Sequence, residues 1–400
     1  MDKILLLGGS SQQVIAIETA KKLGLFTVLC DYLSDNPGQY VADKFYMTST
    51  TDKDAILNIA QSEGIKYIIA YASDPAAPTA AYVAEEMGLS TNPYKAVLTL
   101  CNKDMFREFL STNGFNTPLA KGFNTKDEAI ANIDLFSFPV IIKPVDSSGS
   151  KGATVLQDCD SLEYALDFAF SFSRSHRIII EEFIQKCHPY LIGGDIFVSD
   201  GKIIQWGLMN CHRDETVNSL VPVGKSYPPL LKENELQEIK DTLQRLVSVL
   251  GIKFGPMNVE VVVDNQNRVF PIDIGPRSGG NMIPDLLGLI YGCDVVEMSL
   301  RAAMGEDIVL EEKNGIPFFA SQNLHSDREG LLDRIEFDKE IECFIIRRNI
   351  YKKYGDCVHF FANAADALGV VFFKFPDMET MISMEEHMNE HVKIVLQGET

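Results

Sequence analysis

The stretch GPMNVEVVVDNQNRVFPIDIGPRSGGNMIPDLLGLIY, Gly255 to Tyr291, is the most informative segment of this chain. Its residues Gln266-Asn267 predict a two-residue turn, which makes the flanking residues a β-hairpin. That register places Glu260 directly opposite Asp273. Directly opposed side chains have Cβ atoms about 4.5–5.5 Å apart, and like charges at this spacing repel. The two carboxylates therefore indicate a cation site, or alternatively a hairpin whose acidic face lies in water.

The other face of the hairpin is apolar in this register, and a slip of one residue would bury Glu260 instead. The apolar face is expected to carry Val259, Val261, Val263, Phe270, Ile272 and Ile274. Hard divalent cations prefer oxygen ligands, and Mg²⁺ is usually held by one or two carboxylates together with substrate phosphates. Arg277 then enters a Ser-Gly-Gly-Asn loop suited to contact with an anion.

Length and composition limit the class of protein to which the chain can belong. The 400 residues predict roughly two to four domains, and no apolar run approaches the ~20 residues needed to cross a bilayer. Met1-Asp2-Lys3 leads directly into a buried strand, so no signal peptide is expected. The eight cysteines lack CxxC spacing and predict reduced thiols without zinc. The net charge of −20 disfavours nucleic acid and anionic membranes as partners. A cytoplasmic protein is expected.

The first ninety residues alternate between strand and helix patterns. Strands are predicted at 3–7, 26–30 and 67–71, and helices at 14–23, 52–62 and 76–87. Glycine follows each helix, which is a usual stop signal. Such alternation predicts parallel βαβ units in an open α/β sheet.

The turn after the first strand, Gly8-Gly9-Ser10-Ser11, and Asp31 after the second are typical of dinucleotide folds, but GxGxxG spacing is missing. A small α/β domain that uses its strand ends for substrate fits better. Ser73 and Asp74 end the third strand and are candidate substrate contacts, unless they only satisfy each other in the loop.

A strand, a Gly/Ser-rich turn at 147–152 and a returning strand follow in the middle of the chain. Small residues let backbone N–H groups approach a phosphate, and the hydroxyls of Ser147, Ser148 and Ser150 add donors. The GxxxxGK[ST] pattern is missing, so the closer analogue is the glycine-rich hairpin of kinases. The alternative is a plain mobile hairpin.

Two lysines and one strand end complete the pattern. Lys143 closes an apolar strand, either as a snorkelling edge residue or as a phosphate contact. Lys103 lies in the first turn of a helix for which Asn102 is a good N-cap, although the macrodipole disfavours a cation there. Residues 181–184, Glu-Glu-Phe-Ile, can offer backbone groups to a purine and a carboxylate to a ribose, or simply form an exposed strand end.

Further along, strands are expected at 190–198 and 202–208, a long loop at 210–215, and a helix at 233–250. Short strands, notably 357–361 and 369–373, are expected after about residue 310.

The ordered set of lysines, Gly/Ser turn, Glu-Glu-Phe-Ile, hairpin acids and Ile-Asp-Ile-Gly-Pro-Arg resembles the ATP-grasp superfamily over roughly residues 1–300. Biotin carboxylase, the large chain of carbamoyl-phosphate synthetase, D-alanine–D-alanine ligase and L-amino-acid ligases are members. The resemblance implies an N-terminal open parallel α/β domain (1–92), an ATP-grasp domain (93–305, with a lid at about 118–184) and a small β-rich C-terminal part (306–400).

The resemblance also implies roles for individual residues. The ATP-binding residues would be Lys103, Lys143, Ser147, Ser148, Gly149, Ser150, Gly152, Glu181, Glu182, Phe183, Ile184 and Asp195. Glu260 and Asp273 would bind Mg²⁺, with Mn²⁺ as an alternative. Arg277 would meet the transferred phosphoryl group, and the N–H groups of Gly279 and Gly280 would stabilise an oxyanion. The substrate contacts would be Ser73, Asp74, His212, Arg213 and Ser278.

Two departures from the family pattern stand out. The family usually reads Glu-x-Asn-Pro-Arg where this chain has residues 273–277, Asp-Ile-Gly-Pro-Arg, so one metal ligand is missing and a second Mg²⁺ would be held more weakly. The acid that holds the ribose is also unclear, with Glu182 or Asp195 as candidates.

The implied activity is that of an ATP-dependent carboxylate–amine ligase that forms an acyl phosphate and then an amide, releasing ADP and phosphate. The partners would be a small carboxylate and an amine, and a homodimer would be in keeping with the family. Three alternatives remain: a bicarbonate-using carboxylase, a nucleotide-binding protein without turnover, and a nicotinamide-dependent oxidoreductase. The sequence does not name the acid or the amine.

Overall fold

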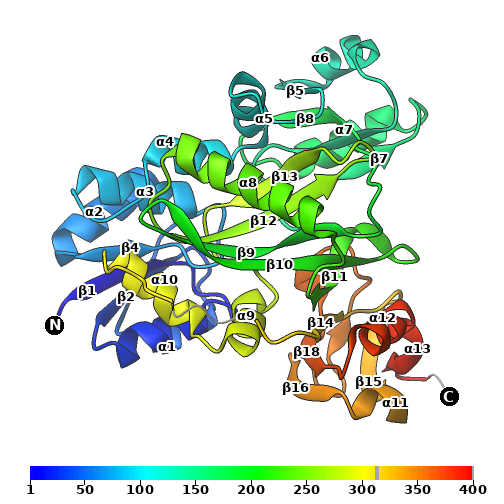
Figure 1. Cartoon of the computed structure of the whole chain (residues 1–400). Helices are drawn as coiled ribbons and strands as arrows, with labels where there is room; N and C mark the ends of the chain where they lie inside the picture. Colours follow the sequence, from blue (N-terminus) through cyan, green and yellow to red (C-terminus); the bar gives the residue numbers. More distant parts are fainter. Residues whose placement is uncertain (311–314, 399–400) are drawn as a thin grey trace.

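The structure, a computed structural model, describes residues 1–310 and 315–398. Figure 1 shows an N-terminal sheet with its helices, a small upper sheet, a long central sheet, and a C-terminal part at the lower right. Among the described residues, every helix is too short or too polar to cross a bilayer.

The N-terminal sheet is parallel, with strand order β3-β2-β1-β4. Its elements are β1 (Lys3–Leu7), α1 (Val14–Lys22), β2 (Phe26–Asp31), η1 (Pro37–Tyr40), β3 (Lys44–Met47), α2 (Lys53–Glu63), β4 (Tyr67–Ile69) and α3 (Ala77–Glu86). The predicted open α/β sheet is confirmed. Strand β3 was not predicted; it is a four-residue edge strand that is exposed or only half-buried along its length.

The small upper sheet has the order β5-β8-β6-β7 and packs on α7. Its elements and the two helices before it are α4 (Tyr94–Leu100), α5 (Lys103–Thr112), β5 (Ala120–Phe123), α6 (Lys126–Ala131), η2 (Ile133–Leu135), β6 (Val140–Pro144), β7 (Thr154–Leu156), α7 (Leu162–Phe172) and β8 (Ile178–Glu182). The predicted strand-turn-strand is confirmed as the antiparallel pair β6–β7. Asn102 is the N-cap residue of α5, as predicted, but its side chain makes no capping bond, and its buried Oδ1 has no hydrogen-bond partner among the described residues.

The central sheet has eight strands in the order β13-β12-β9-β10-β11-β14-β18-β16. Its first part and its helices are β9 (Leu191–Ser199), β10 (Lys202–Asp214), β11 (Asn218–Tyr227), α8 (Glu233–Leu250), β12 (Gly255–Val263), β13 (Val269–Gly275), α9 (Ile283–Tyr291) and α10 (Val295–Ala303). The predicted long loop at 210–215 is wrong. Most of it lies in β10, which pairs with β11, a strand whose polar residues hide its character in the sequence.

The C-terminal residues complete the central sheet and add a three-stranded sheet, β17-β15-β19. The elements are β14 (Phe319–Leu324), β15 (Gly330–Phe337), α11 (Lys339–Glu342), β16 (Ile345–Ile350), β17 (Cys357–Val358), η3 (Ala364–Asp366), β18 (Gly369–Lys374), α12 (Met378–Glu386), α13 (Met388–His391) and β19 (Val392–Leu396). Because β14, β16 and β18 join β9 to β13, the sheet runs across the predicted boundary at residue 305. The three-part division of the chain stays a prediction.

The β12–β13 hairpin pairs Glu260 with Asp273 as expected, but by another route. The chain turns one residue earlier than predicted, through 265–267, with Asn267 at φ +57°. The register then shifts between Glu260 and Val261, which leaves Ile272 as the extra residue of a β-bulge. The predicted apolar face is therefore wrong at Phe270 and Ile272. The bulge restores the pairing of the two acids that the early turn would have broken.

Candidate functional site

A pocket of about 210 Å³ lies between the small upper sheet and the β12–β13 hairpin. It brings together most of the predicted nucleotide and metal residues from six separate segments. The predicted residues that line it are Lys103, Lys143, Ser147, Ser148, Gly149, Ser150, Glu181, Glu182, Phe183, Ile184, Arg213, Glu260 and Asp273. Gly152, Asp195 and His212 are not among its lining residues.

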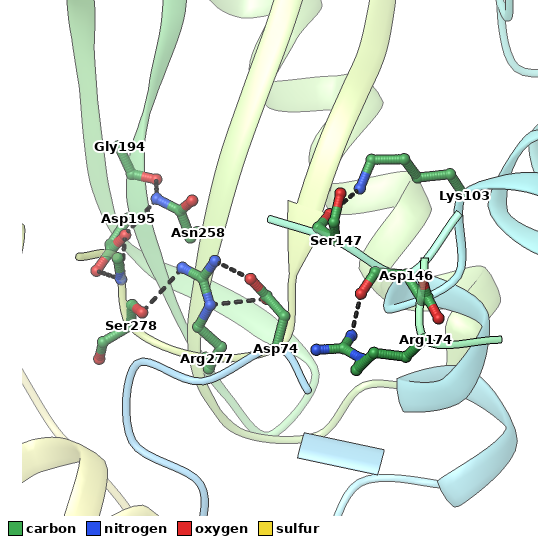
Figure 2. Close-up of polar contacts among 11 residues, drawn as sticks. Asp74, Lys103, Asp146, Ser147, Arg174, Gly194, Asp195, Asn258, Arg277 and Ser278 are labelled. Atoms are coloured by element: carbon green, nitrogen blue, oxygen red, sulfur yellow. Dashed lines mark hydrogen bonds and ion pairs between the residues drawn. The ribbon is translucent and has the colours of Figure 1, made fainter. Parts of the chain in front are cut away.

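The Gly/Ser turn is held over the pocket by contacts with other segments. Lys103 Nζ donates to the carbonyl of Ser147 at 2.6 Å, which Figure 2 shows. Ser150 Oγ donates to the carbonyl of Leu220 at 2.8 Å. Gly152 instead packs against the ring of Pro144, where a Cβ would lie 2.9 Å from its Cγ. The glycine is therefore needed for the fold of the turn, and its contact with the nucleotide stays a prediction.

Glu181 lies at the centre of a buried ion network in the pocket wall. Its carboxylate lies 2.9 Å from Lys143 Nζ and 3.1 Å from Arg107 Nε. Burial alone would raise the pKa of Glu181, but the two cations outweigh it and lower the pKa to about 2. Burial also lowers the pKa of Lys143. The carboxylate of Glu181 thus partly offsets the charge of Lys143, and this ion pair fixes the position of the Lys143 side chain.

Arg107 was missed by the sequence reasoning. Besides its contact with Glu181, Arg107 donates from Nη2 to the carbonyl of Ile272 at 2.8 Å. Ile272 is the extra residue of the β-bulge. Arg107 therefore ties α5 and β8 to the part of the hairpin that aligns the two acids. A signal was available, because Lys103 and Arg107 stand four residues apart on one helix. Like charges at that spacing repel unless anions lie nearby.

Glu260 and Asp273 face the pocket from paired positions. Arg213 Nη2 lies 2.6 Å from Glu260 Oε1. Burial would raise the pKa of Glu260, but Arg213 and Lys225 lower it, so the carboxylate is charged at neutral pH. Among the described residues, no group of three or more His, Cys, Asp or Glu gathers as a metal cluster. Two charged carboxylates still fit Mg²⁺, which takes its remaining ligands from phosphates and water.

Lys225 is a second residue that the sequence reasoning missed. It is buried, with Nζ 2.7 Å from the Sγ of Cys211 on the paired strand. Gly193 lies between Cys211 and Glu260, since a Cβ there would lie 3.1 Å from that Sγ and 3.2 Å from the Cγ of Glu260. This cluster depends on the β10–β11 pairing, which the sequence did not predict.

A second polar cluster lies beside the pocket, around Arg277, and Figure 2 shows its contacts. Arg277 donates two hydrogen bonds to the carboxylate of Asp74, one from Nη2 to Oδ2 and one from Nε to Oδ1 at 2.7 Å. Burial would raise the pKa of Asp74, but Arg277 lowers it. A Cβ on Gly275 would lie 2.6 Å from Asp74 Oδ1. The position where the family has asparagine is therefore glycine here because the carboxylate of Asp74 occupies that space.

Asp195 lies in this second cluster and not in the pocket. Its two oxygens accept from the N–H of Gly279 at 2.8 and 3.0 Å, and Oδ1 accepts from Asn258 Nδ2 at 2.9 Å. The contact of Asp195 with the ribose and the oxyanion role of Gly279 stay predictions, and in this structure these groups are bonded to one another. Ser278 is buried, and its Oγ has no hydrogen-bond partner among the described residues.

His212 points to the opposite face of β10 from Arg213. Its Nε2 lies 2.8 Å from Ser226 Oγ and 2.8 Å from Glu385 on α12. Neighbouring side chains of a strand point to opposite faces, so His212 does not line the pocket with Arg213, and its contact with a substrate stays a prediction. Ser73 stays a prediction; its carbonyl accepts from the N–H of Ala77.

Comparison with known proteins identifies the fold. Residues 102–311 match the family model described as the carbamoyl-phosphate synthase L chain, ATP binding domain. The match covers more than half of the 400 residues. The chain belongs to this ATP-grasp family. The expected resemblance, the fold class and ATP as the nucleotide are thereby confirmed.

Relatives of this ATP-grasp ligase support the same placement. A formate-dependent phosphoribosylglycinamide formyltransferase of Wolinella succinogenes is 26% identical over 346 residues, which is 84% of each chain. The crystal structure of an L-amino acid ligase from Bacillus licheniformis superposes with a TM-score of 0.82 at 19% identity, over 100% of this chain and 99% of that one. The biotin carboxylase domain of a 2-oxoglutarate carboxylase from Hydrogenobacter thermophilus, solved with MgADP and bicarbonate, gives 0.74 at 17% identity, over 99% and 91%.

Proposed function

We propose that this ATP-grasp protein is a carboxylate–amine ligase that activates its acid as an acyl phosphate. The observation that carries the proposal is the convergence of Lys103, Lys143 and the Gly/Ser turn with two facing carboxylates on one pocket. The lysines and the turn bind the nucleotide phosphates. The backbone and side chains of residues 181–184 frame the adenine, and Glu182, half-buried at the pocket edge, holds the ribose.

Glu260 and Asp273 hold Mg²⁺, which offsets the charge of the phosphates when it is bound. Phosphoryl transfer needs positioning and charge compensation more than covalent help from the protein. Arg213 keeps Glu260 ionised and oriented toward the pocket. Arg107 holds the hairpin bulge. These residues fix the carboxylates before the nucleotide arrives, so little free energy is spent on reorganisation.

The reaction has two steps. An oxygen of the substrate carboxylate attacks the γ-phosphorus of ATP, the bond to the β–γ bridging oxygen breaks, and ADP leaves. The nitrogen of the amine then attacks the acyl carbon, the bond to the phosphate oxygen breaks, and the amine loses a proton to the released phosphate or to water. Arg277 lies beside the pocket, and we assign it to the acyl phosphate. Gly280 remains the candidate donor to the tetrahedral oxyanion.

The test is a screen of carboxylic acids paired with amines, in which phosphate release from Mg-ATP is followed. We expect release that requires both an acid and an amine, with one amide formed for each phosphate. Failure of the folded protein to bind Mg-ATP in calorimetry would refute the proposal. Release that needs bicarbonate alone would identify a carboxylase, and binding without release under any pair would identify a nucleotide-binding protein. The cytoplasmic location and the homodimer stay predictions.

A further inference from the structure

Three loops at the carboxyl ends of the N-terminal sheet form one surface. They are residues 8–13 after β1, 32–40 after β2 and 70–76 after β4. The N–H of Gly38 donates to the carbonyl of Gly9 at 2.8 Å, and Gln13 Nε2 donates to the carbonyl of Tyr71 at 2.8 Å. Open α/β sheets bind their ligands at this edge.

This surface faces the second polar cluster and the Gly/Ser turn. Asp74 of the third loop holds Arg277, and Lys103 and Ser148 of the nucleotide site contribute to lowering the pKa of Asp74. The N–H of Asn281 donates to Gln12 Oε1 at 3.2 Å. Because Asp74 and Gln12 contact the segment that carries Arg277, we place the amine that attacks the acyl carbon against these loops.

The surface has no cation of its own. None of the residues in 8–13, 32–40, 70–76 or the facing segment 278–283 is Lys, Arg or His. Of the two flanking arginines, Arg347 is paired with Asp285 at 2.9 Å, and Arg277, which is held by Asp74, is assigned to the acyl phosphate of the other substrate. Recognition of a phosphate group needs charge-assisted hydrogen bonds from such side chains or free backbone N–H groups.

The first three backbone N–H groups of the glycine turn, those of Gly8, Gly9 and Ser10, are also engaged. Gly9 donates to Asp31 Oδ2 at 2.7 Å, and Ser10 donates to Gln13 Oε1 at 2.9 Å. In dinucleotide folds this turn approaches a phosphate. Here a carboxylate of the protein takes that place, and its charge repels a second anion. The same contacts argue against the nicotinamide-dependent alternative.

We propose that the amine substrate of this ligase carries no phosphate group and that its distal end is neutral or cationic. The inference rests on the proposed function and adds the chemical class of the second substrate. The exposed hydroxyl and amide groups of Ser10, Ser11 and Gln12 suit such an end, as does the local excess of acids. The Wolinella succinogenes relative is named for a phosphoribosyl substrate.

The experiment uses amines in matched pairs that differ only in one phosphate, such as serine with O-phosphoserine and ethanolamine with O-phosphoethanolamine. Each is offered with a panel of carboxylic acids and Mg-ATP, and ADP release is measured. We expect the active amines to be unphosphorylated, with phosphorylated partners slower by about tenfold or more. Equal or faster rates with phosphorylated amines would overturn this inference and leave the ligase proposal intact. Absence of release from both halves of the library would overturn the ligase proposal and this inference with it.

A gain-of-charge variant tests the physical cause. Ser11→Lys adds a cation to the exposed loop, and we expect it to strengthen inhibition by the phosphorylated amines by about tenfold while the KM for ATP stays unchanged. Ser62→Lys, on the exposed end of α2, is the matched control and should change neither value. Equal inhibition of Ser11→Lys and Ser62→Lys would show that these loops do not meet the distal end of the amine.

Discussion

The nucleotide pocket and the Arg277 cluster lie side by side, yet they distribute charge in opposite ways. In the pocket, Lys103 donates to a backbone carbonyl and, among the described residues, is paired with no carboxylate, so its charge is available to a ligand. In the cluster, Arg277 is held by Asp74, and the N–H of Gly279 by Asp195. The pocket thus keeps one cation available beside its paired Lys143, whereas the arginine of the cluster is paired with Asp74.

This difference explains why the nucleotide site could be recognised in the sequence, whereas the pairing of charges around Arg277 could not. Phosphate chemistry is shared across the family, and it needs the same residue types at the same places in the chain. The second substrate varies, and its surface is assembled from loop residues that are polar but common. The following four predictions, in order of decreasing effect, probe this contrast.

The first prediction concerns the buried ion network of the nucleotide pocket. Glu181→Gln should lower the free energy of unfolding by about 3–5 kcal/mol, because Arg107 and Lys143 would stay buried without a countercharge. The pKa of Glu181 is lowered from 4.5 to about 2. Its contribution is therefore complete above pH 4.5 and is lost as the pH falls toward 2. Urea unfolding at several pH values measures it.

The exposed Glu238→Gln is the matched control and should leave the stability unchanged within error. A difference between wild type and Glu181→Gln that stays constant down to pH 2 would contradict the assigned ion pairs.

The second prediction concerns the metal carboxylates. Glu260→Gln should lower kcat by about 10²–10³-fold, because the charge that holds Mg²⁺ against the phosphates is removed. The loss of stability should be small, since the glutamine fills the same space. Steady-state phosphate release and thermal unfolding measure the two effects, and Mg²⁺ dependence should shift to higher concentration. Unchanged activity would mean that Glu260 does not bind the metal.

The third prediction separates the two regions by ligand. Lys143→Ala should weaken ATP binding by about 1.5–3 kcal/mol, the size of a hydrogen bond to a charged group. The affinity of the protein for the amine, measured with a saturating ATP analogue, should not change. Isothermal calorimetry of Lys143→Ala and of the exposed Lys121→Ala provides the comparison. A wild-type affinity for ATP in Lys143→Ala would remove this lysine from the site.

The fourth prediction concerns the glycine that replaces the family's asparagine. Gly275→Ala places a Cβ 2.6 Å from Asp74 Oδ1, so it should cost about 1–3 kcal/mol by overpacking. The KM for the amine should rise, whereas the affinity for ATP should not. In a double-mutant cycle, the same substitution in an Asp74→Ala background should cost less. Additive effects would show that Asp74 does not occupy the space beside Gly275.

The hairpin shows how far local sequence rules reach. The pairing of Glu260 with Asp273 was predicted from a two-residue turn, but the turn lies one residue earlier and a bulge at Ile272 compensates. Alternating polarity identified the strands and their facing acids. The bulge could not be predicted, because it depends on Arg107 binding the carbonyl of Ile272 from a helix 165 residues away.

The assignments of His212 and Asp195 stay predictions, and the protein partners of both residues were not indicated by the sequence. The polar residues and Pro222 of β11 hid its strand character, so the β10–β11 pair and its alternation were missed and His212 was placed in a loop. Asp195 was chosen by elimination, whereas its partner, the N–H of Gly279, lies 84 residues further along the chain. Neither partner is signalled by spacing or composition.

Local chemistry in the chain was enough to establish the parallel N-terminal sheet, the Gly/Ser turn, the two lysines and the acidic hairpin, since periodicity and residue type act over a few neighbouring positions. The tertiary structure decided which of the charged side chains are paired with an opposite charge of the protein. Whether an arginine meets a substrate or an aspartate depends on segments brought together from distant parts of the chain, such as Asp74 and Arg277, and on the free energy of burying one charge against another.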